Sequence, residues 1–590
     1  MPDSRVPLPG SAHKDLSPLE VESNEGFGSL TFDIDLLLRP RSGESPAEAA
    51  AKLDDVPLHE RQYLTHDEVE ARYGADPADV AKLQRFADEF GLKLIHAKLE
   101  ERRVRVEGTV SAYGKAFRAQ LREFRDEGGS FISHVEPLEV PSYLGGIVER
   151  VLGLHGKPAI EPDLYWRGAS AHQRAATDPT GEVGNPDFSA PDVAQLYDFP
   201  ASTGAGQVVG VIELAGGYQP KEIEQYFRHV GLSQKPTLVN VGPNVRAPRV
   251  LSNMEVTMNV QLVASVCPDA TTVVYNAASK TYSLDDYYGV FSTAIHDRVN
   301  RPSVLSNSWS WSELFAQGTD LSHFDRLFAI ASLLGITICG SAGNSGAQTL
   351  HFFEDRPAIV PSVRFPSSNP RVLACGGTSL FASGGEIRNE VVWDRLADHL
   401  RIVQTAGGRR DIANSHGMAS TGGVSRMHGR PAYQDGADIP VLRHYAWHNG
   451  ELRDIEEQAG RGVPDVAANA DLETGYRFVF LDPPAAQGPE AGIELPEDGL
   501  VVGGGTSAAT PMWAALVTRI NEGLGRRVGT LQPSLYRLVV DQGTPVCRRI
   551  THGENGGYAA HPELVWNGCT GLGTPRGKAL LAALRAMSSE

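Results

Sequence analysis

The stretch VVGGGTSAATPMWAALVTRI, residues 501–520, places a hydroxyl side chain directly before a helix. Three glycines lead into Thr506 and Ser507, and Pro511 then opens an apolar run with helical spacing. Glycines leave room for a substrate beside the backbone, and a helix N-terminus favours developing negative charge. The stretch has neither the lysine of G-x-x-x-x-G-K-S/T nor the spacing of G-x-G-x-x-G, so it does not predict a phosphate cradle. It predicts a nucleophile at Ser507, with a packing turn as the alternative.

A nucleophilic serine needs a base nearby. No G-x-S-x-G elbow is present, and none of the 18 histidines lies in a triad motif. His444 and His448 in HYAWH lack the glutamate of H-E-x-x-H, so we predict no zinc site there. The better candidate base is Glu255 in SNMEVTMNVQLVASVCPDA, because Glu255 and Asn259 share one face of an otherwise apolar helix. A glutamate that faces solvent near a helix end is the alternative.

A third candidate lies in TICGSAGNSGAQ, where an apolar strand runs into a tight turn that contains Asn344. Asparagine is common in such turns for conformational reasons alone. Its side-chain amide is also a suitable donor to an oxyanion. The three segments together are more specific than any one of them, and they point to acyl-transfer chemistry.

Length and charge narrow the class of protein. A chain of 590 residues is long enough for two or three domains. The net charge of −18 argues against nucleic acid or an anionic membrane as a partner. No apolar run approaches the roughly 18 residues of a membrane span. The start, MPDSRVPLPGSAHKDL, has no apolar core of a secretory signal, so we expect a cytoplasmic protein, with export by another route left open.

Five cysteines in this length exclude a disulfide scaffold. Cys267, Cys339 and Cys375 lie in apolar runs and are expected to be buried thiols. Pairing of Cys547 with Cys569 stays open, because spacing alone does not establish it.

The pattern along the chain predicts an N-terminal α+β domain over 1–167, a linker over 168–188 and an α/β domain over 189–590. The linker is rich in small and turn residues and is therefore a candidate processing site. After it, short apolar strands alternate with helical stretches, which predicts a mostly parallel sheet covered by helices. Several of these strands end in Gly/Ser/Asn turns, where open α/β sheets place their sites.

From about residue 28 onward the chain resembles the sedolisin family of serine-carboxyl peptidases, close to the kumamolisins. The resemblance rests on blocks in the family's order: SAPDVAQLYDFP, GQVVGVIELAGGY, SNSWSWSE, FPSSNPRVLACGGTS, STGGVSRMHGRPAYQ, RGVPDVAANADLETGY and CTGLGTPRG. It implies a subtilisin-like domain preceded by a prosegment. The partners it implies are a peptide or protein substrate and the chain's own prosegment.

The same resemblance assigns residues to roles. Ser507 falls on the nucleophile of the GGTSA block, and Glu255 falls on the general base. Asn259 falls where the family has an aspartate that bonds this glutamate, and Asn344 falls on the oxyanion aspartate of AGDSG. The block SNSWSWSE implies that Ser308, Trp309 and Ser310 line the peptide-binding cleft.

The calcium site of the family is altered in this sequence. The family's Asp-Ile pair aligns with Arg549-Ile550, and its Trp-Asp pair aligns with Trp566-Asn567. A hard dication needs oxygen ligands and negative charge, so a guanidinium in this place is repulsive. We expect no cofactor, because calcium binding is lost and Arg549 replaces the charge of the cation.

The two amides predict a change in pH dependence. An asparagine amide donates at every pH, whereas an aspartate donates only when protonated, so Asn344 favours activity near neutral pH. Asn259 can orient Glu255 but cannot relay a proton, and its bond to the ionised carboxylate is expected to keep Glu255 a weak base. We expect a calcium-independent serine endopeptidase that, if active, cuts itself within about 168–188. The alternatives are a catalytically impaired pseudopeptidase that binds peptides or proteins, or a related acyl-transfer enzyme.

Overall fold

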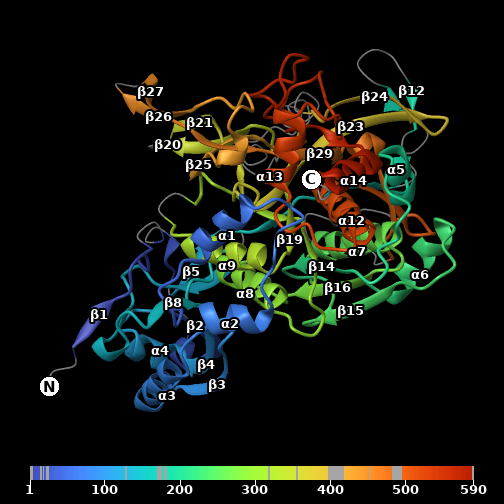
Figure 1. Ribbon diagram of the computed structural model, residues 1–590. Coiled ribbons are helices and arrows are strands. Elements are labelled where there is room, and N and C mark those ends of the chain that lie inside the picture. Colours follow the sequence, from blue (N-terminus) through green and yellow to red (C-terminus); the bar gives the residue numbers. More distant parts are fainter. Residues whose placement is uncertain are drawn as a thin grey trace.

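Residues 4–587 are described in the computed structural model apart from 14–15, 17–18, 22–24, 127–128, 169–175, 178–182, 186, 317–318, 354–355, 396–417, 449–450 and 482–494. Most of the predicted linker therefore lies outside the described residues. The chain forms a small N-terminal domain beside a larger α/β domain (Figure 1). No helix in the described ranges is long and apolar enough to cross a membrane.

An antiparallel four-stranded sheet forms the centre of the N-terminal domain. Its strands, in spatial order, are β3 (Lys93–Lys98), β4 (Arg103–Thr109), β2 (Thr31–Leu38) and β8 (Val148–Leu152). Helix α2 (His66–Tyr73) begins with a capping box made by Thr65, and α3 (Pro77–Phe90) begins at the N-cap Asp76. These caps confirm the two predicted helical patterns with a break between them.

A mostly parallel sheet forms the centre of the larger domain, as predicted. Its strands, in spatial order, are β15 (Thr237–Val241), β16 (Thr271–Asn276), β14 (Val208–Glu213), β17 (Val304–Asn307), β19 (Thr337–Ser341), β23 (Val372–Ser383) and β24 (Glu386–Val392), and β29 (Val466–Asn469) also pairs with β23. Only β24 runs antiparallel to its neighbour in this sheet. Both faces of the central strands β16, β14, β17, β19 and β23 are buried, which explains why these strands are mostly apolar runs.

Helices cover both faces of this sheet. One face packs against α7 (Val250–Val266) and α12 (Thr506–Leu524), and the other packs against α8 (Leu284–Ile295) and α9 (Ser322–Leu333). Neighbouring residues of β14 alternate between the two cores, since Val211 belongs to the first and Ile212 to the second. The first of these two layers holds α7 and α12 against the same side of the sheet.

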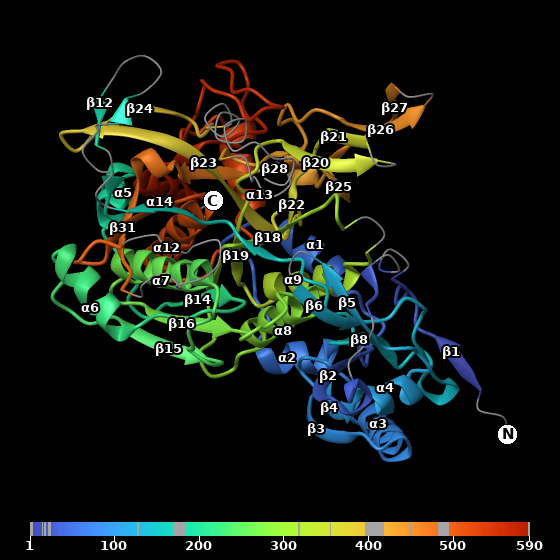
Figure 2. The same cartoon turned by 180° about the vertical axis from the view of Figure 1, so that it is seen from behind.

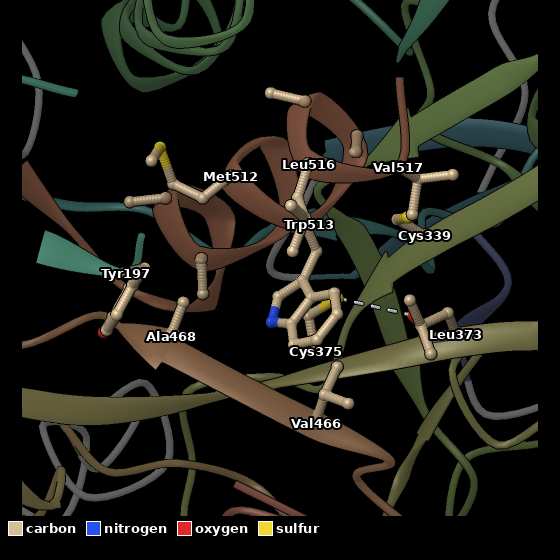
Figure 3. Packing of buried hydrophobic residues seen from close by; sticks show 14 of the residues in the cluster. Tyr197, Cys339, Leu373, Cys375, Val466, Ala468, Met512, Trp513, Leu516 and Val517 are labelled. Carbon is tan, nitrogen blue, oxygen red and sulfur yellow. Dashed lines mark hydrogen bonds between the residues drawn. The ribbon is translucent and has the colours of Figure 1, made fainter. Parts of the chain in front are cut away.

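Helix α12 carries Ser507 and is fixed by a dense core (Figure 3). Trp513 is fully buried and donates from its indole nitrogen to the carbonyl of Ala467 over 2.8 Å. Around it pack apolar side chains from α12, β19, β23 and β29, among them Leu516, Cys339 and Cys375. A helix anchored in this way holds its first turn in a fixed place relative to the ends of the strands.

The N-terminal domain docks on the α8–α9 face of the larger domain (Figure 2). Helix α1 (Pro46–Asp54) packs against α9, and Asp54 pairs with Arg371 over 2.9 Å. Arg61 is buried and donates to the carbonyl of Thr530 over 2.9 Å. Polar contacts as well as apolar packing therefore hold the two domains together.

After the N-terminal domain, the chain crosses the larger domain as two short strands. Strand β9 (Glu161–Pro162) pairs antiparallel with β18 (Trp309–Ser312), and β10 (Tyr165–Gly168) pairs antiparallel with β31 (Leu500–Gly504). The domain boundary expected after residue 167 thus falls inside β10, because the segment before it already belongs to a sheet of the larger domain.

Candidate active site

Ser507 and Glu255 meet at the buried junction of α12 and α7. The Ser507 hydroxyl donates to Oε2 of Glu255 over 3.0 Å, and both side chains are fully buried. Ser507 lies in the first turn of α12, directly after the turn at Gly505. The structure thus brings together the two residues that the sequence analysis paired, and Glu255 does not face solvent.

Asn259 lies one helical turn after Glu255 and contacts it, as the spacing predicts. Its Nδ2 donates to Oε1 of Glu255 over 2.9 Å and to Oε1 of Glu213 over 3.0 Å. Its Oδ1 accepts a bond from the hydroxyl of Ser308 over 3.3 Å. The amide therefore uses both of its hydrogens to join two carboxyl groups.

Glu213 is a site residue that the sequence analysis missed. It ends β14, is fully buried, and also accepts a bond from the indole nitrogen of Trp309 over 2.8 Å. One feature of the sequence could have identified it, because Glu213 directly follows the apolar run VVGVI at the carboxyl end of a strand. A glutamate is expensive to bury there, so its presence suggests a functional role. No spacing in the sequence links it to Glu255, and only the packing of α7 on β14 brings them together.

Burial raises the pKa of both glutamates. The pKa of Glu213 rises to about 8, although bonds from Asn259 and Trp309 favour its ionised form. The pKa of Glu255 lies well above its usual range, first because of burial and then because of neighbouring Glu213. The hydrogen bond from Asn259 favours the ionised form of Glu255, as expected, whereas burial and the second carboxyl act in the opposite direction.

Asn344 lies in the turn after β19, beside the start of α12. Its Oδ1 accepts bonds from the backbone nitrogen of Thr506 over 2.8 Å and from the Thr506 hydroxyl over 3.0 Å. This arrangement fixes the orientation of the amide. The preceding residue, Gly343, has φ 106°, which explains the sharp turn at this place.

The segment Ser308–Ser310 lies beside β9, and its place in a peptide-binding cleft stays a prediction. Trp309 lies opposite Pro162 in the register. The backbone nitrogen of Asp163 donates to the carbonyl of Ser308 over 3.0 Å. The carbonyl of Asp163 in turn accepts from the backbone nitrogen of Ser507 over 3.2 Å.

Gly505 makes this approach possible. Its φ is 93°, and a Cβ there would lie 2.2 Å from the Asp163 carbonyl oxygen and 2.7 Å from Nδ2 of Asn344. The carbonyl oxygen and the amide nitrogen therefore flank the same glycine. The Asp163 carbonyl oxygen accepts from the Ser507 N–H, and the Asn344 amide nitrogen also borders Gly505.

The region that aligns with the family's calcium site is filled by hydrogen-bond donors. Arg549 donates to the carbonyl of Pro562, and Asn567 directs its amide nitrogen to the carbonyl of Ile550 over 3.4 Å. Oδ1 of Asn567 accepts from the backbone nitrogen of Thr570 over 2.9 Å. Donors on these carbonyls compete with a cation for the same lone pairs, so the residues present do not fit a calcium ion.

All five cysteines are buried free thiols. Cys267, Cys339 and Cys375 are buried as predicted, and Cys547 and Cys569 are free thiols, so the open pairing is not formed. His444 and His448 of HYAWH lie in strand β26 (Leu442–His448) and not on a helix.

The chain is similar to known proteins along its whole length. Residues 28–156 match the pro-kumamolisin activation domain. Kumamolisin from Bacillus sp. (strain MN-32) is 32% identical, and the match covers 100% of this chain and 98% of that protein. Sedolisin from Pseudomonas sp. (strain 101) is 25% identical over 88% of this chain and 80% of that protein. The solved structure of Pseudomonas sedolisin with two molecules of pseudo-iodotyrostatin has a similar fold, with TM-score 0.53 and 22% identity over 69% of this chain and 99% of that chain.

These relatives correct one expectation. A cytoplasmic location, inferred from the N-terminal sequence, is wrong, because sedolisin-family relatives with such prosegments are secreted or lysosomal enzymes. The absence of an apolar core in the first residues was therefore a poor guide to location.

The match to kumamolisin spans both chains almost completely, and the activation domain accounts for most of the N-terminal domain. The chain belongs to the sedolisin family of serine-carboxyl peptidases and carries the family's prosegment.

Proposed function

We propose that this protein is a serine endopeptidase in which Ser507 is the nucleophile and Glu255 is the general base. The observation that carries the proposal is the 3.0 Å hydrogen bond from the Ser507 hydroxyl to Oε2 of Glu255. In the first step Ser507 Oγ attacks a peptide carbonyl carbon while its proton moves to Glu255. Glu255 then gives this proton to the leaving amine, and water hydrolyses the acyl-enzyme by the same route.

The negative charge of the tetrahedral intermediate is assigned to the Ser507 N–H and the Asn344 amide. The amide's oxygen is held by Thr506, so its nitrogen is the group left to donate. A donor held in place before the reaction costs no reorganisation when charge develops, and such a donor is worth roughly 10²–10³ in rate, as the asparagine of subtilisin illustrates.

The pH dependence follows from the direction of the Glu255 pKa shift. A general base must be ionised, and burial together with Glu213 raises the pKa of Glu255. Activity should therefore rise from acid towards neutral pH as the Glu255–Glu213 pair loses its proton. Asn344 donates at every pH, so the oxyanion site imposes no loss of activity on the neutral side.

Calcium independence is part of the same proposal. The contacts of Arg549 and Asn567 support it, since both residues direct donors at backbone carbonyls. The cation's structural role then falls to these hydrogen bonds within the loop.

The test is the intact mass of the full chain after incubation from acid to neutral pH. The wild type should lose its N-terminal domain from the main chain, whereas Ser507→Ala and Glu255→Gln should keep full mass. Ser265→Ala is the matched control, because Ser265 is a buried serine on the same helix α7 whose hydroxyl donates to the backbone carbonyl of Leu262. If no variant cuts itself or added peptides at any pH, the protein is a peptide-binding pseudopeptidase instead.

A further inference from the structure

We infer that the site is set to cut the bond between Asp163 and Leu164 of its own chain, and that Arg364 makes the pocket before the cut selective for an acidic side chain. This inference rests on the proposed function and adds to it the class of substrate. Residues 161–168 cross the site as the short strands β9 and β10 with two residues between them.

The register places one bond of this strand at the nucleophile. On the N-terminal side, β9 pairs with β18, and on the C-terminal side, β10 pairs with β31. Between them, Asp163 gives its N–H to the Ser308 carbonyl over 3.0 Å and receives the Ser507 N–H on its own carbonyl over 3.2 Å. The carbonyl of Asp163 is therefore the group in the oxyanion position, and Leu164 carries the leaving amine.

The side chain of Asp163 occupies a closed polar pocket. Ser341 donates to its Oδ2 over 2.7 Å, and Ser310 donates to the same oxygen. Arg364 Nη1 bonds Oδ1 over 3.1 Å and also donates to the Ser310 hydroxyl over 3.0 Å. A carboxylate accepts all of these bonds, so the pocket matches an acceptor-only group.

Arg364 is buried in this pocket, and the neighbouring backbone leaves room for its side chain. Its side chain is 10% exposed, and the Asp163 side chain is 2% exposed. A Cβ on Gly343 would lie 2.4 Å from Cδ of Arg364, so the glycine of the oxyanion turn makes room for the arginine. Arg364 Nη2 lies 4.0 Å from Glu161, which extends the preference for negative charge two residues upstream.

Replacing either partner of the Asp163–Arg364 pair should cost free energy. Burial raises the pKa of the Asp163 carboxyl, and Arg364 opposes that rise. An amide or an apolar side chain in the pocket leaves a buried guanidinium without its charge partner. Substrates with Asp before the cut should therefore be favoured over those with Asn, a side chain of the same shape.

The covalent step balances with water as the second substrate. Ser507 Oγ bonds the carbonyl carbon of Asp163, the C–N bond to Leu164 breaks, and the serine proton reaches the Leu164 nitrogen through Glu255. Water then hydrolyses the ester, which leaves a carboxyl group on Asp163 and restores the Ser507 hydroxyl. The cut lies upstream of the stretch 168–188 in which cutting was expected from the sequence.

The first experiment follows self-cutting of the full chain by intact mass. The wild type should yield a fragment that begins at Leu164. Asp163→Asn and Arg364→Gln should each slow that cut by roughly 30-fold or more, the range for truncating one partner of a buried charge pair. Arg388→Gln is the matched control, because Arg388 pairs with Glu386 on the surface. A first cut elsewhere, or equal rates in all four proteins, overturns the inference.

The second experiment uses added peptides that differ only in Asp, Asn or Leu before the cut, with the self-cut wild-type enzyme. The wild type should favour Asp over Asn by roughly 30-fold in kcat/KM, and Arg364→Gln should lose most of this discrimination. Cleavage of all peptides without preference would overturn the acidic pocket while leaving the proposed peptidase function intact.

A third measurement tests the pocket in a protein that does not cut itself. In the Ser507→Ala background, hydrogen exchange of residues 161–168 should be about tenfold faster when Arg364→Gln is added, because a buried charged hydrogen bond is lost. Adding Arg388→Gln should change nothing. If no peptide is ever cleaved, the proposed function fails, and unchanged exchange in Arg364→Gln would overturn the pocket assignment separately.

Discussion

Asn259 donates to Glu213 over 3.0 Å with the same amide group that bonds the candidate base Glu255. Two buried carboxyl groups thus share one neutral donor, with Trp309 and Ser507 as the donors to their outer oxygens. A neutral amide can hold both groups but accepts no proton from either through its nitrogen. The proton that Ser507 releases therefore stays on the carboxyl pair until the leaving amine takes it.

Asn259→Leu should slow self-cutting and move its rising limb to higher pH. The Asn259 bond favours the ionised forms of Glu255 and Glu213, so its loss raises both pKa values further. We expect a rate lower by roughly 10- to 100-fold at neutral pH, the worth of a bond to a charged group. Intact mass against time at several pH values measures both effects. Gln261→Leu on the same helix removes a buried amide that bonds only Val479, and it should leave the pH limb in place.

Glu213→Gln should flatten the dependence of stability on pH. The pKa of Glu213 in the folded protein is about 8, above its usual value of 4.5, so between these values the folded state binds the extra proton and stability falls as pH rises. The glutamine variant should lose up to about 1.4 kcal/mol per pH unit of this slope. Urea unfolding from pH 5 to 9 in the Ser507→Ala background measures it.

The control for this prediction is Glu222→Gln. Glu222 is also fully buried, but it pairs with Arg246, so removing its charge should lower stability at every pH in this range. If Glu213→Gln and the wild type keep parallel stability curves, Glu213 does not bind the extra proton.

Asn344→Asp should lower activity most towards neutral pH, because an aspartate donates to the oxyanion only when it is protonated, whereas Glu255 acts only when it is ionised. The aspartate can still accept from Thr506, but its other oxygen donates only when protonated. Asn344→Ala should instead lose roughly 10²–10³ in rate at every pH. The pH profile of self-cutting separates the two variants. Ser345→Ala in the same turn should behave as the wild type, and an acid optimum in the unmodified protein would contradict the role of the amide.

The sequence predicted those parts of the site that lie within one element or follow a local motif. The spacing of Glu255 and Asn259 needed only a helix, and Ser507 needed only a glycine turn before one. Glu213 could not be paired with them, because its place depends on how α7 packs across β14. Asp163 could not be identified either, since its contact with Ser507 depends on how residues 161–168 pair with β18 and β31 of the larger domain.

The thermal midpoint of the wild type should not change with millimolar calcium or with a chelator. Arg549 and Asn567 direct donors at the carbonyls of Pro562 and Ile550, and a dication would have to displace both. Scanning calorimetry measures this in the Ser507→Ala background. The double variant Arg549→Asp with Asn567→Asp should gain a midpoint that rises with calcium concentration, because binding to the folded state alone stabilises it. A calcium-dependent rise in the unmodified protein would contradict the prediction.

Alanine variants of two glycines at opposite ends of α12 distinguish the effect of backbone strain from the effect of a blocked site. Gly505 and Gly525 both have positive φ, 93° and 68°, so alanine is strained at either position. At Gly525 a Cβ meets nothing within 4 Å, whereas at Gly505 it lies 2.2 Å from the Asp163 carbonyl oxygen. Gly525→Ala should therefore lower stability by about 1 kcal/mol and still cut itself. Gly505→Ala should stop self-cutting, because the carbonyl can no longer reach the Ser507 N–H. Cutting at the wild-type rate in folded Gly505→Ala would show that the carbonyl reacts from another position.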